Sequence, residues 1–159
     1  MPRYRCKMPH TIPLIGEKFM NRVLLAFSAA LLATMALAQD RIPAAAGAAV
    51  YITAPRNGAK IHGPVTVLFG LKGMGVAPAG IKFDNTGHHH LLVDTDVSEL
   101  KLGAAVPATD KVLHFGKGQT ETTLTLAPGK HTLQLLFADY QHLSFDPPLQ
   151  SEKITITVD

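Results

Sequence analysis

The sequence predicts an all-β protein, an immunoglobulin-like antiparallel β-sandwich of about seven strands, preceded by a helical signal peptide. Three observations support this fold class. From about residue 49 onward, apolar and polar residues alternate with a period of two, which is the spacing of a half-buried strand. The helical period of 3.6 residues is not sustained in the same region. Proline, glycine and asparagine interrupt the alternation at short intervals, as they do between the strands of a sandwich.

The first 38 residues have the three parts of a secretory signal. Arg22 supplies a positive charge, residues 23–35 are apolar, and the Ala-Leu-Ala tripeptide at 36–38 is a small-x-small cleavage site. The apolar run is shorter than the roughly 20 residues that span a bilayer. We therefore expect cleavage after this tripeptide. Residues 1–19 either extend the charged n-region or precede a second start codon at Met20. The product is expected to be periplasmic or secreted, with no membrane attachment.

Removal of the signal changes the composition of the remaining chain. Cys6 is the single cysteine, so residues 39–159 contain no disulfide and no thiol nucleophile. Five of the fifteen basic residues and one of the twelve acidic residues also lie before residue 39, which leaves the remainder close to neutral. A near-neutral domain lacks the basic face that binds nucleic acid. We expect no nucleic-acid partner, and the partner is a ligand or protein that composition does not identify.

Residues 39–48 are expected to form a flexible lead-in, and residues 49–159 a single β-sandwich domain. The predicted strands are 49–54, 65–71, 88–94, 112–115, 121–126, 131–138 and 152–158. Alternation assigns three sets of side chains to inner faces: Val65, Val67, Phe69 and Leu71; Leu133, Leu135 and Phe137; Ile154, Ile156 and Val158. Pro128 and Gly129 predict a type II turn, and therefore a hairpin between the strands on either side.

Histidine is the chemically distinctive residue type of the predicted domain, because seven of the eight histidines follow residue 38. Three of them are consecutive, at positions 88–90. On a strand, His88 and His90 project from one face and His89 from the other. Neutral imidazole is a preferred ligand of zinc and Cu(II). With His114 as a third ligand from a neighbouring strand, the pattern predicts an open three-histidine site for Zn or Cu(II).

The remaining histidines allow other interpretations. His131 and His142 are alternative third ligands, while His89 is predicted to be a hydrogen-bonded core residue and His62 a turn residue. Met74 is the only methionine after the signal, which disfavours a methionine-rich Cu(I) site. Histidines on a strand also commonly serve as internal hydrogen-bonding groups, so the metal site is one of two interpretations.

A polar loop follows His114. Gly116 and Gly118 permit backbone angles that other residues avoid, which is typical of a turn between strands. Loops on a rigid scaffold often carry binding residues. The predicted ligand-binding side chains at this rim are Lys117, Gln119, Thr120 and Glu121.

Three classes of function remain open at this point. The first is an exported binding module with a histidine-rich polar site. The second is a structural or protein-interaction sandwich without a metal. The third is a hydrolase-like enzyme in which a histidine works with Asp94 or Glu121. An enzyme is the less favoured class, because the exported part has no cysteine and no serine within a Gly-x-Ser-x-Gly elbow.

Four segments together resemble a known family: residues 73–80, 85–92, 114–121 and 128–135. Over about residues 50–158 the chain is similar to the bacterial domain-of-unknown-function family numbered forty-three ninety-nine. The resemblance implies an exported protein and assigns no activity. The family's signature positions correspond here to His88, His89, His90, Leu91, His114, Phe115, Gly116, Lys117, Gly118, Gln119 and Thr120.

Overall fold

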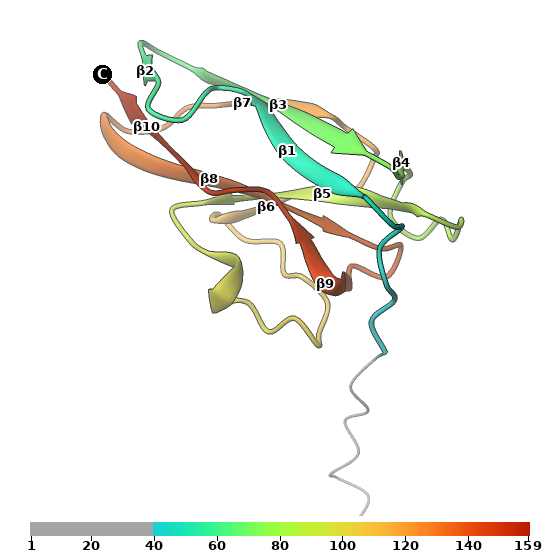
Figure 1. The fold of residues 1–159 in the computed structure, drawn as a ribbon. Coiled ribbons are helices and arrows are strands. Elements are labelled where there is room, and N and C mark those ends of the chain that lie inside the picture. Colours follow the sequence, from blue (N-terminus) through green and yellow to red (C-terminus); the bar gives the residue numbers. More distant parts are fainter. Residues whose placement is uncertain (1–39) are drawn as a thin grey trace, which may run out of the picture. The chain divides into compact units, whose positions relative to one another are not determined.

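Residues 40–159 are described by a computed structural model, in which two β-sheets face each other (Figure 1). The predicted signal peptide at 1–38 lies outside the described residues. Within residues 40–159, no helix combines the length and hydropathy of a membrane span.

The smaller sheet has three antiparallel strands in the order β1-β3-β7. They are β1 (Ala49–Ala54), β3 (Val65–Lys72) and β7 (Glu121–Leu124). Alternation along β3 buries Val65, Val67 and Phe69, and Thr66 on the opposite face pairs its hydroxyl with that of Thr123 at 3.2 Å. The predicted inner face of this strand is therefore confirmed.

The larger sheet has the order β2-β10-β8-β5-β4. Its strands are β2 (Lys60–Ile61), β4 (Gly75–Val76), β5 (Thr86–Val93), β6 (Val112–Phe115), β8 (Gly129–Ala138), β9 (Ser144–Gln150) and β10 (Ile154–Val158). Strands β4 and β6 follow one another along one edge of β5, while β10 and β9 follow one another along β8. The centre of the sheet is the antiparallel β5–β8 pair.

All seven predicted strands are present, and their arrangement is that of an immunoglobulin-like sandwich. The first, second and fifth of them (β1, β3, β7) form one sheet, and the third, sixth and seventh (β5, β8, β10) form the other, with β6 added beside β5. The predicted fold class is confirmed. The structure adds two short strands, a 3₁₀ turn η1 (Val97–Glu99) and β9, which alternation alone did not indicate.

The predicted hairpin around Pro128 and Gly129 is wrong. β7 pairs with β3 and β8 pairs with β5 and β10, so the intervening residues carry the chain from one sheet to the other. Gly129 has a φ of 142° and already lies in β8, opposite Val158. A Pro-Gly bend is compatible with a short crossover between two sheets as well as with a hairpin. Which connection forms depends on where each strand can bury its apolar face.

Strand β5 is buried on both faces, and this double burial creates the site described below. Its inner face joins the main core between the sheets. Its outer face is covered by the long loop at 94–111, which Figure 1 shows on the side of β5 and β8 opposite β1 and β3. The loop completes a second apolar cluster: Leu92, Val97, Val106, Val112, Leu136 and Ala138.

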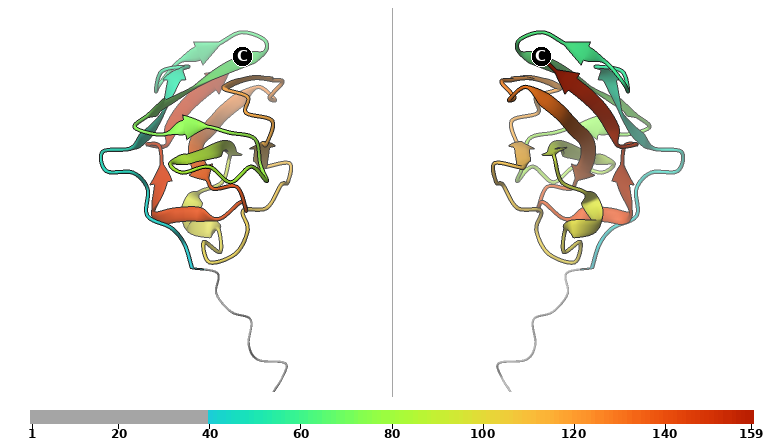
Figure 2. Two further views of the ribbon diagram at one scale, coloured as in Figure 1. Left: turned by 90° about the vertical axis from the view of Figure 1, so that its right-hand side faces the viewer. Right: turned by 90° about the vertical axis from the view of Figure 1, so that its left-hand side faces the viewer.

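The lead-in at 40–48, predicted to be flexible, lies against β9 in the structure (Figure 2). The Arg41 guanidinium donates to the carbonyls of Ser144 and Phe145 and lies 3.4 Å from the Asp146 carboxylate. Asp146 in turn donates its N–H to the Ile42 carbonyl at 2.9 Å. These contacts hold residues 41 and 42 against strand β9 of the larger sheet.

Candidate metal centre

Strand β5 places His88 and His90 side by side on the outer face of the larger sheet. Both side chains are 0% exposed, and their Nε2 atoms lie 3.4 Å apart. A nitrogen-to-nitrogen hydrogen bond is ordinarily closer to about 3.0 Å. Two imidazoles on one tetrahedral zinc ion, with bonds of about 2.0–2.1 Å, hold their nitrogens about 3.3–3.4 Å apart. The separation in the structure fits the second geometry.

His114 reaches the same place from β6, where it is directly opposite His90 in the antiparallel register. Ligand nitrogens of His88, His90 and His114 all lie within 4.8 Å of one another. The three histidines predicted to converge are thus brought together by the β5–β6 pairing. His114 is the exposed member of the three, so its ring is the one free to adjust.

Gly116 explains how the His114 ring finds room. A Cβ atom built at residue 116 would lie 2.3 Å from Cε1 and 2.4 Å from Nε2 of His114, far inside van der Waals contact. The Ala79 methyl stands on another side of the same position, at 3.2 Å. The glycine of the loop that follows β6 is therefore required for the observed orientation of the ring.

A fourth ring, that of His142, stands against the other three. Its centroid lies 4.9 Å from that of His88, 4.8 Å from that of His114 and 6.0 Å from that of His90. His142 precedes β9, and the sequence predicts it only as an alternative third ligand. No spacing in the sequence links it to β5, and its residue type was the only available signal.

Burial favours the uncharged form of His88, His90 and His114. Desolvation, reinforced by the neighbouring imidazoles, lowers the pKa of His88 to about 4 and that of His90 to about 3. Desolvation and the nearby His142 also lower the pKa of His114. Neutral imidazole is the form that binds a metal ion, so these groups are ready to coordinate at neutral pH without first losing a proton.

The Nδ1 atoms of His88 and His90 have no hydrogen-bond partner among the described residues. At many metal sites a carboxylate or carbonyl accepts from this nitrogen and fixes the ring. Here the register of β5 with β6 and β8 fixes the backbone positions from which the two rings project.

The other histidines have different surroundings. His89 faces the main core, with its ring 5.2 Å from that of Phe69 and 4.9 Å from that of Phe137. Its position in the core is as predicted, but neither ring nitrogen has a hydrogen-bond partner among the described residues, so the predicted hydrogen bond is missing. The Gln119 backbone is the neighbour that favours the charged ring, yet burial outweighs it and lowers the pKa of His89 to about 4.

His131, the second alternative ligand, is not part of the cluster. It lies near the opposite end of β8, where Nδ1 pairs with the Asp94 carboxylate and Nε2 donates to the Ala127 carbonyl, both at 2.8 Å. Asp94 is therefore engaged by His131 and is not beside the cluster. His62 is exposed and lies 3.2 Å from Asp159.

The four predicted ligand-binding side chains lie beyond Gly116 and are exposed. The Gln119 side-chain oxygen accepts from the Lys117 N–H at 2.9 Å, so it closes the loop on itself. The Thr120 carbonyl accepts from Phe69, and Glu121 begins β7 opposite Leu68. Gly116 joins this loop to the cluster, and a binding role for the four side chains stays a prediction.

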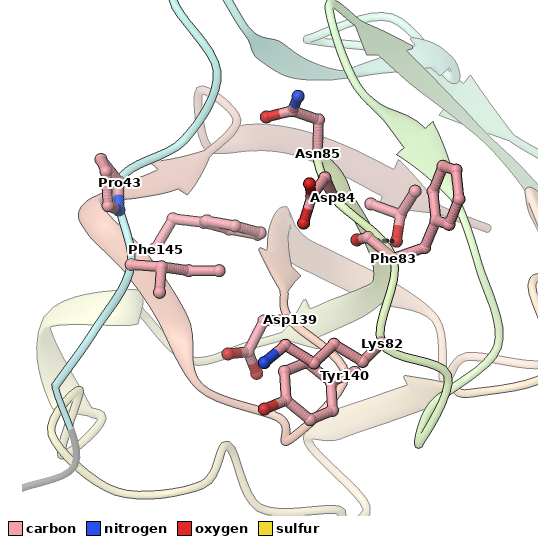
Figure 3. Close-up of a pocket in the computed structure, with 10 residues that line it drawn as sticks. Pro43, Lys82, Phe83, Asp84, Asn85, Asp139, Tyr140 and Phe145 are labelled. Carbon is pink, nitrogen blue, oxygen red and sulfur yellow. Dashed lines mark hydrogen bonds between the residues drawn. The ribbon is translucent and has the colours of Figure 1, made fainter.

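A separate pocket of about 270 Å³ adjoins the loop that carries His142 (Figure 3). Lys82, Asp84 and Tyr140 line it, together with Asp139 and Phe145. The Lys82 amino group lies 5.7 Å from the centre of the Tyr140 ring. Figure 3 shows Lys82 extending past this ring toward Asp139. The predicted rim residues 117–121 are not among the described residues that line this pocket.

Comparison with known families finds the same family that the sequence motifs resemble. The family described as "Domain of unknown function (DUF4399)" matches residues 67–159, which include all four clustered histidines. The chain belongs to the DUF4399 family. No curated protein matches it significantly.

Two solved structures are similar to this DUF4399 protein. The endo-β-1,4-mannanase from Thermotoga petrophila is 17% identical, with a TM-score of 0.41, over 70% of this chain and 20% of the mannanase. The fibronectin(III)-like modules of Clostridium thermocellum CbhA are 14% identical, with a TM-score of 0.35, over 69% of this chain and 92% of that one. This chain thus spans about a fifth of the mannanase's length.

Proposed function

We propose that this DUF4399 protein is an exported binding module that holds one Zn²⁺ or Cu(II) ion through His88, His90 and His114. The observation that carries the proposal is the convergence of three imidazoles from two adjacent strands, with ligand nitrogens within 4.8 Å. The predicted signal peptide would deliver the protein to the periplasm or beyond, where it would meet the ion.

The free-energy cost of burying polar groups without partners supports a bound metal ion. A buried polar group without a partner costs about 1–3 kcal/mol. The His88 and His90 nitrogens that face each other have only a 3.4 Å contact, and the group that converges with them contains no carboxylate. An ion between these nitrogens would use both lone pairs at once. It would also bind the rings in their neutral form, which the lowered pKa values of both residues favour.

The structure argues less for the enzyme alternative. Asp94 is paired with His131 at the far end of β5, and Glu121 begins β7 in the other sheet. Neither carboxylate belongs to the convergent group. The remaining alternative is a structural cluster without metal, in which His88 and His90 contact only each other, and titration with metal ions separates the two.

Isothermal titration of the purified protein, free of any polyhistidine tag, with Zn²⁺ and with Cu(II) tests the proposal. We expect one ion per chain. The double variant His88→Ala, His90→Ala should weaken binding by more than about 100-fold, because both buried ligands are lost. His131→Ala is the matched control, since it removes a histidine of the same sheet outside the cluster. Absence of binding, or equal affinity in the double variant, would overturn the proposal.

A further inference from the structure

We infer that His142 is a fourth ligand, so that the site is a closed, tetrahedral four-imidazole centre suited to Zn²⁺. This inference rests on the proposed function and extends it from three ligands to four, and from two candidate metals to one. It also assigns the site to holding the ion, since four protein ligands leave no position for a reacting water.

The six distances among the four rings carry the inference. Four imidazoles bound through a ring nitrogen to one tetrahedral zinc, with bonds of about 2.0–2.1 Å, have ring centres about 5 Å apart in every pair. Five of the six pairs in the structure lie between 4.8 and 5.0 Å, and the sixth, His90 with His142, lies at 6.0 Å. The rings thus occupy the corners of a slightly stretched tetrahedron.

Ring stacking does not explain this arrangement. The planes of the six pairs are inclined by 34° to 89°, so none of them is a parallel stack. The rings come from β5, β6 and the segment before β9, and the convergent group formed by three of them contains no acidic side chain. Four imidazoles around a common centre form the donor set of a zinc site.

The segment that carries His142 is built to hold this ring in place. His142 has a φ of 67°, a left-handed conformation that non-glycine residues rarely adopt. The buried Asp139 carboxylate accepts from the N–H groups of Gln141 and Leu143, and the Asp139 carbonyl accepts from His142 itself. The His142 carbonyl accepts from Val106 in the covering loop at 2.8 Å. The backbone on both sides of the residue is therefore fixed.

The longest of the six distances, between the His90 and His142 rings, shows which ring must move when the ion binds. The His142 nitrogens lie outside the group within 4.8 Å, since this ring is 1 Å farther from His90 than the other rings are. His142 is partly exposed, so a rotation of its side chain brings a nitrogen to the centre. The buried pair His88 and His90 anchors the ion, and His114 with His142 closes the site from the solvent side.

The test uses Co(II) as a spectroscopic substitute for Zn²⁺, together with azide as an external ligand. In the unmodified protein we expect the intense visible absorption of tetrahedral Co(II) and no change when azide is added. In His142→Asn, where asparagine tolerates the left-handed backbone, we expect at least about tenfold weaker Zn²⁺ binding and a spectrum that shifts with azide. Gln141→Ala, an exposed change in the same segment, is the matched control.

The outcomes distinguish this inference from the proposed function. If the unmodified protein binds Co(II) and its spectrum responds to azide, the site is open and His142 is not a ligand. The same conclusion follows if His142→Asn keeps the original affinity and spectrum. Binding of Cu(II) but not of Zn²⁺ or Co(II) would overturn this inference alone, whereas failure of the unmodified protein to bind any of the three ions would overturn the proposed function itself. His142→Gly, which removes all backbone strain at this position, provides a second variant should His142→Asn not fold.

Discussion

The two ends of the β5–β8 pair use histidine in opposite ways. At one end, His88 and His90 are buried among other imidazoles, and burial lowers their pKa values. At the other end, the Asp94 carboxylate and the Ala127 carbonyl engage both nitrogens of His131 and raise its pKa. The same residue type is therefore kept neutral at one end and favours the charged form at the other.

The difference shows that burial sets the charge of His88 and His90, whereas hydrogen-bond partners set the charge of His131. An imidazole whose nitrogens both donate to oxygen atoms has no lone pair left for a metal ion. His131 is such a residue, and its hydrogen bond to Asp94 links the start of β8 to the residue that follows β5. The convergent group of His88, His90 and His114 contains no carboxylate that could engage these imidazoles as Asp94 engages His131.

Acidification should have the largest effect, and it acts on the cluster. His88 and His90 take up protons near pH 6.5 in the unfolded chain but only near pH 3 to 4 in the folded metal-free protein. Below pH 6.5 the unfolded state therefore binds more protons, and the free energy of unfolding falls as pH falls. Between pH 7.5 and pH 5 we expect a loss of the order of 2 kcal/mol for each ring, measured by urea denaturation.

The same measurement on the His88→Ala, His90→Ala variant provides the control, because its stability should depend much less on pH over this interval. His131 acts with the opposite sign: its raised pKa stabilises the fold below pH 6.5, and this contribution is lost as pH rises through the folded value. Equal stability of the original metal-free protein at pH 7.5 and pH 5 would contradict neutral burial of His88 and His90.

Gly116→Ala should have an effect of intermediate size, a loss of zinc affinity that arises within the histidine cluster. The added methyl would overlap the His114 ring, which must then turn away from the other imidazoles. We expect about tenfold weaker zinc binding, comparable to the loss of a group that orients a ligand, as measured by competition with a chelating dye. Gly103→Ala, where a Cβ would meet nothing within 4 Å, is the control. Unchanged affinity in Gly116→Ala would remove His114 from the ligand set.

His131→Ala should have the smallest effect and should leave metal binding unchanged. The variant loses a partly exposed ion pair and a hydrogen bond to the Ala127 carbonyl, at a cost of about 1 kcal/mol. The loss should be greater at pH 6 than at pH 8, because the charged ring makes the stronger pair with Asp94. A decrease in zinc affinity in this variant would show that the two ends of the sheet are not independent.

Local sequence patterns predicted a large part of the fold. Strands β1 and β6 have the predicted bounds, and the inner faces of β3, β8 and β10 follow from the alternation of apolar residues. The predicted hairpin at Pro128 and Gly129 is wrong because the local sequence defines the bend but not the sheet to which the next strand belongs. Strand β9 contains two consecutive prolines, which ordinarily argue against a strand.

The local sequence is enough to place His88 and His90 on one face, because side chains two residues apart on a strand always share it. The same period of two predicts the all-β class. That His142 joins the cluster and His131 does not follows from tertiary contacts alone. Those contacts depend on strand register and on a segment far along the chain, where the hydrogen bonds of Asp139 hold His142. Residues distant in sequence meet only when the sheets close, so no local pattern records their proximity.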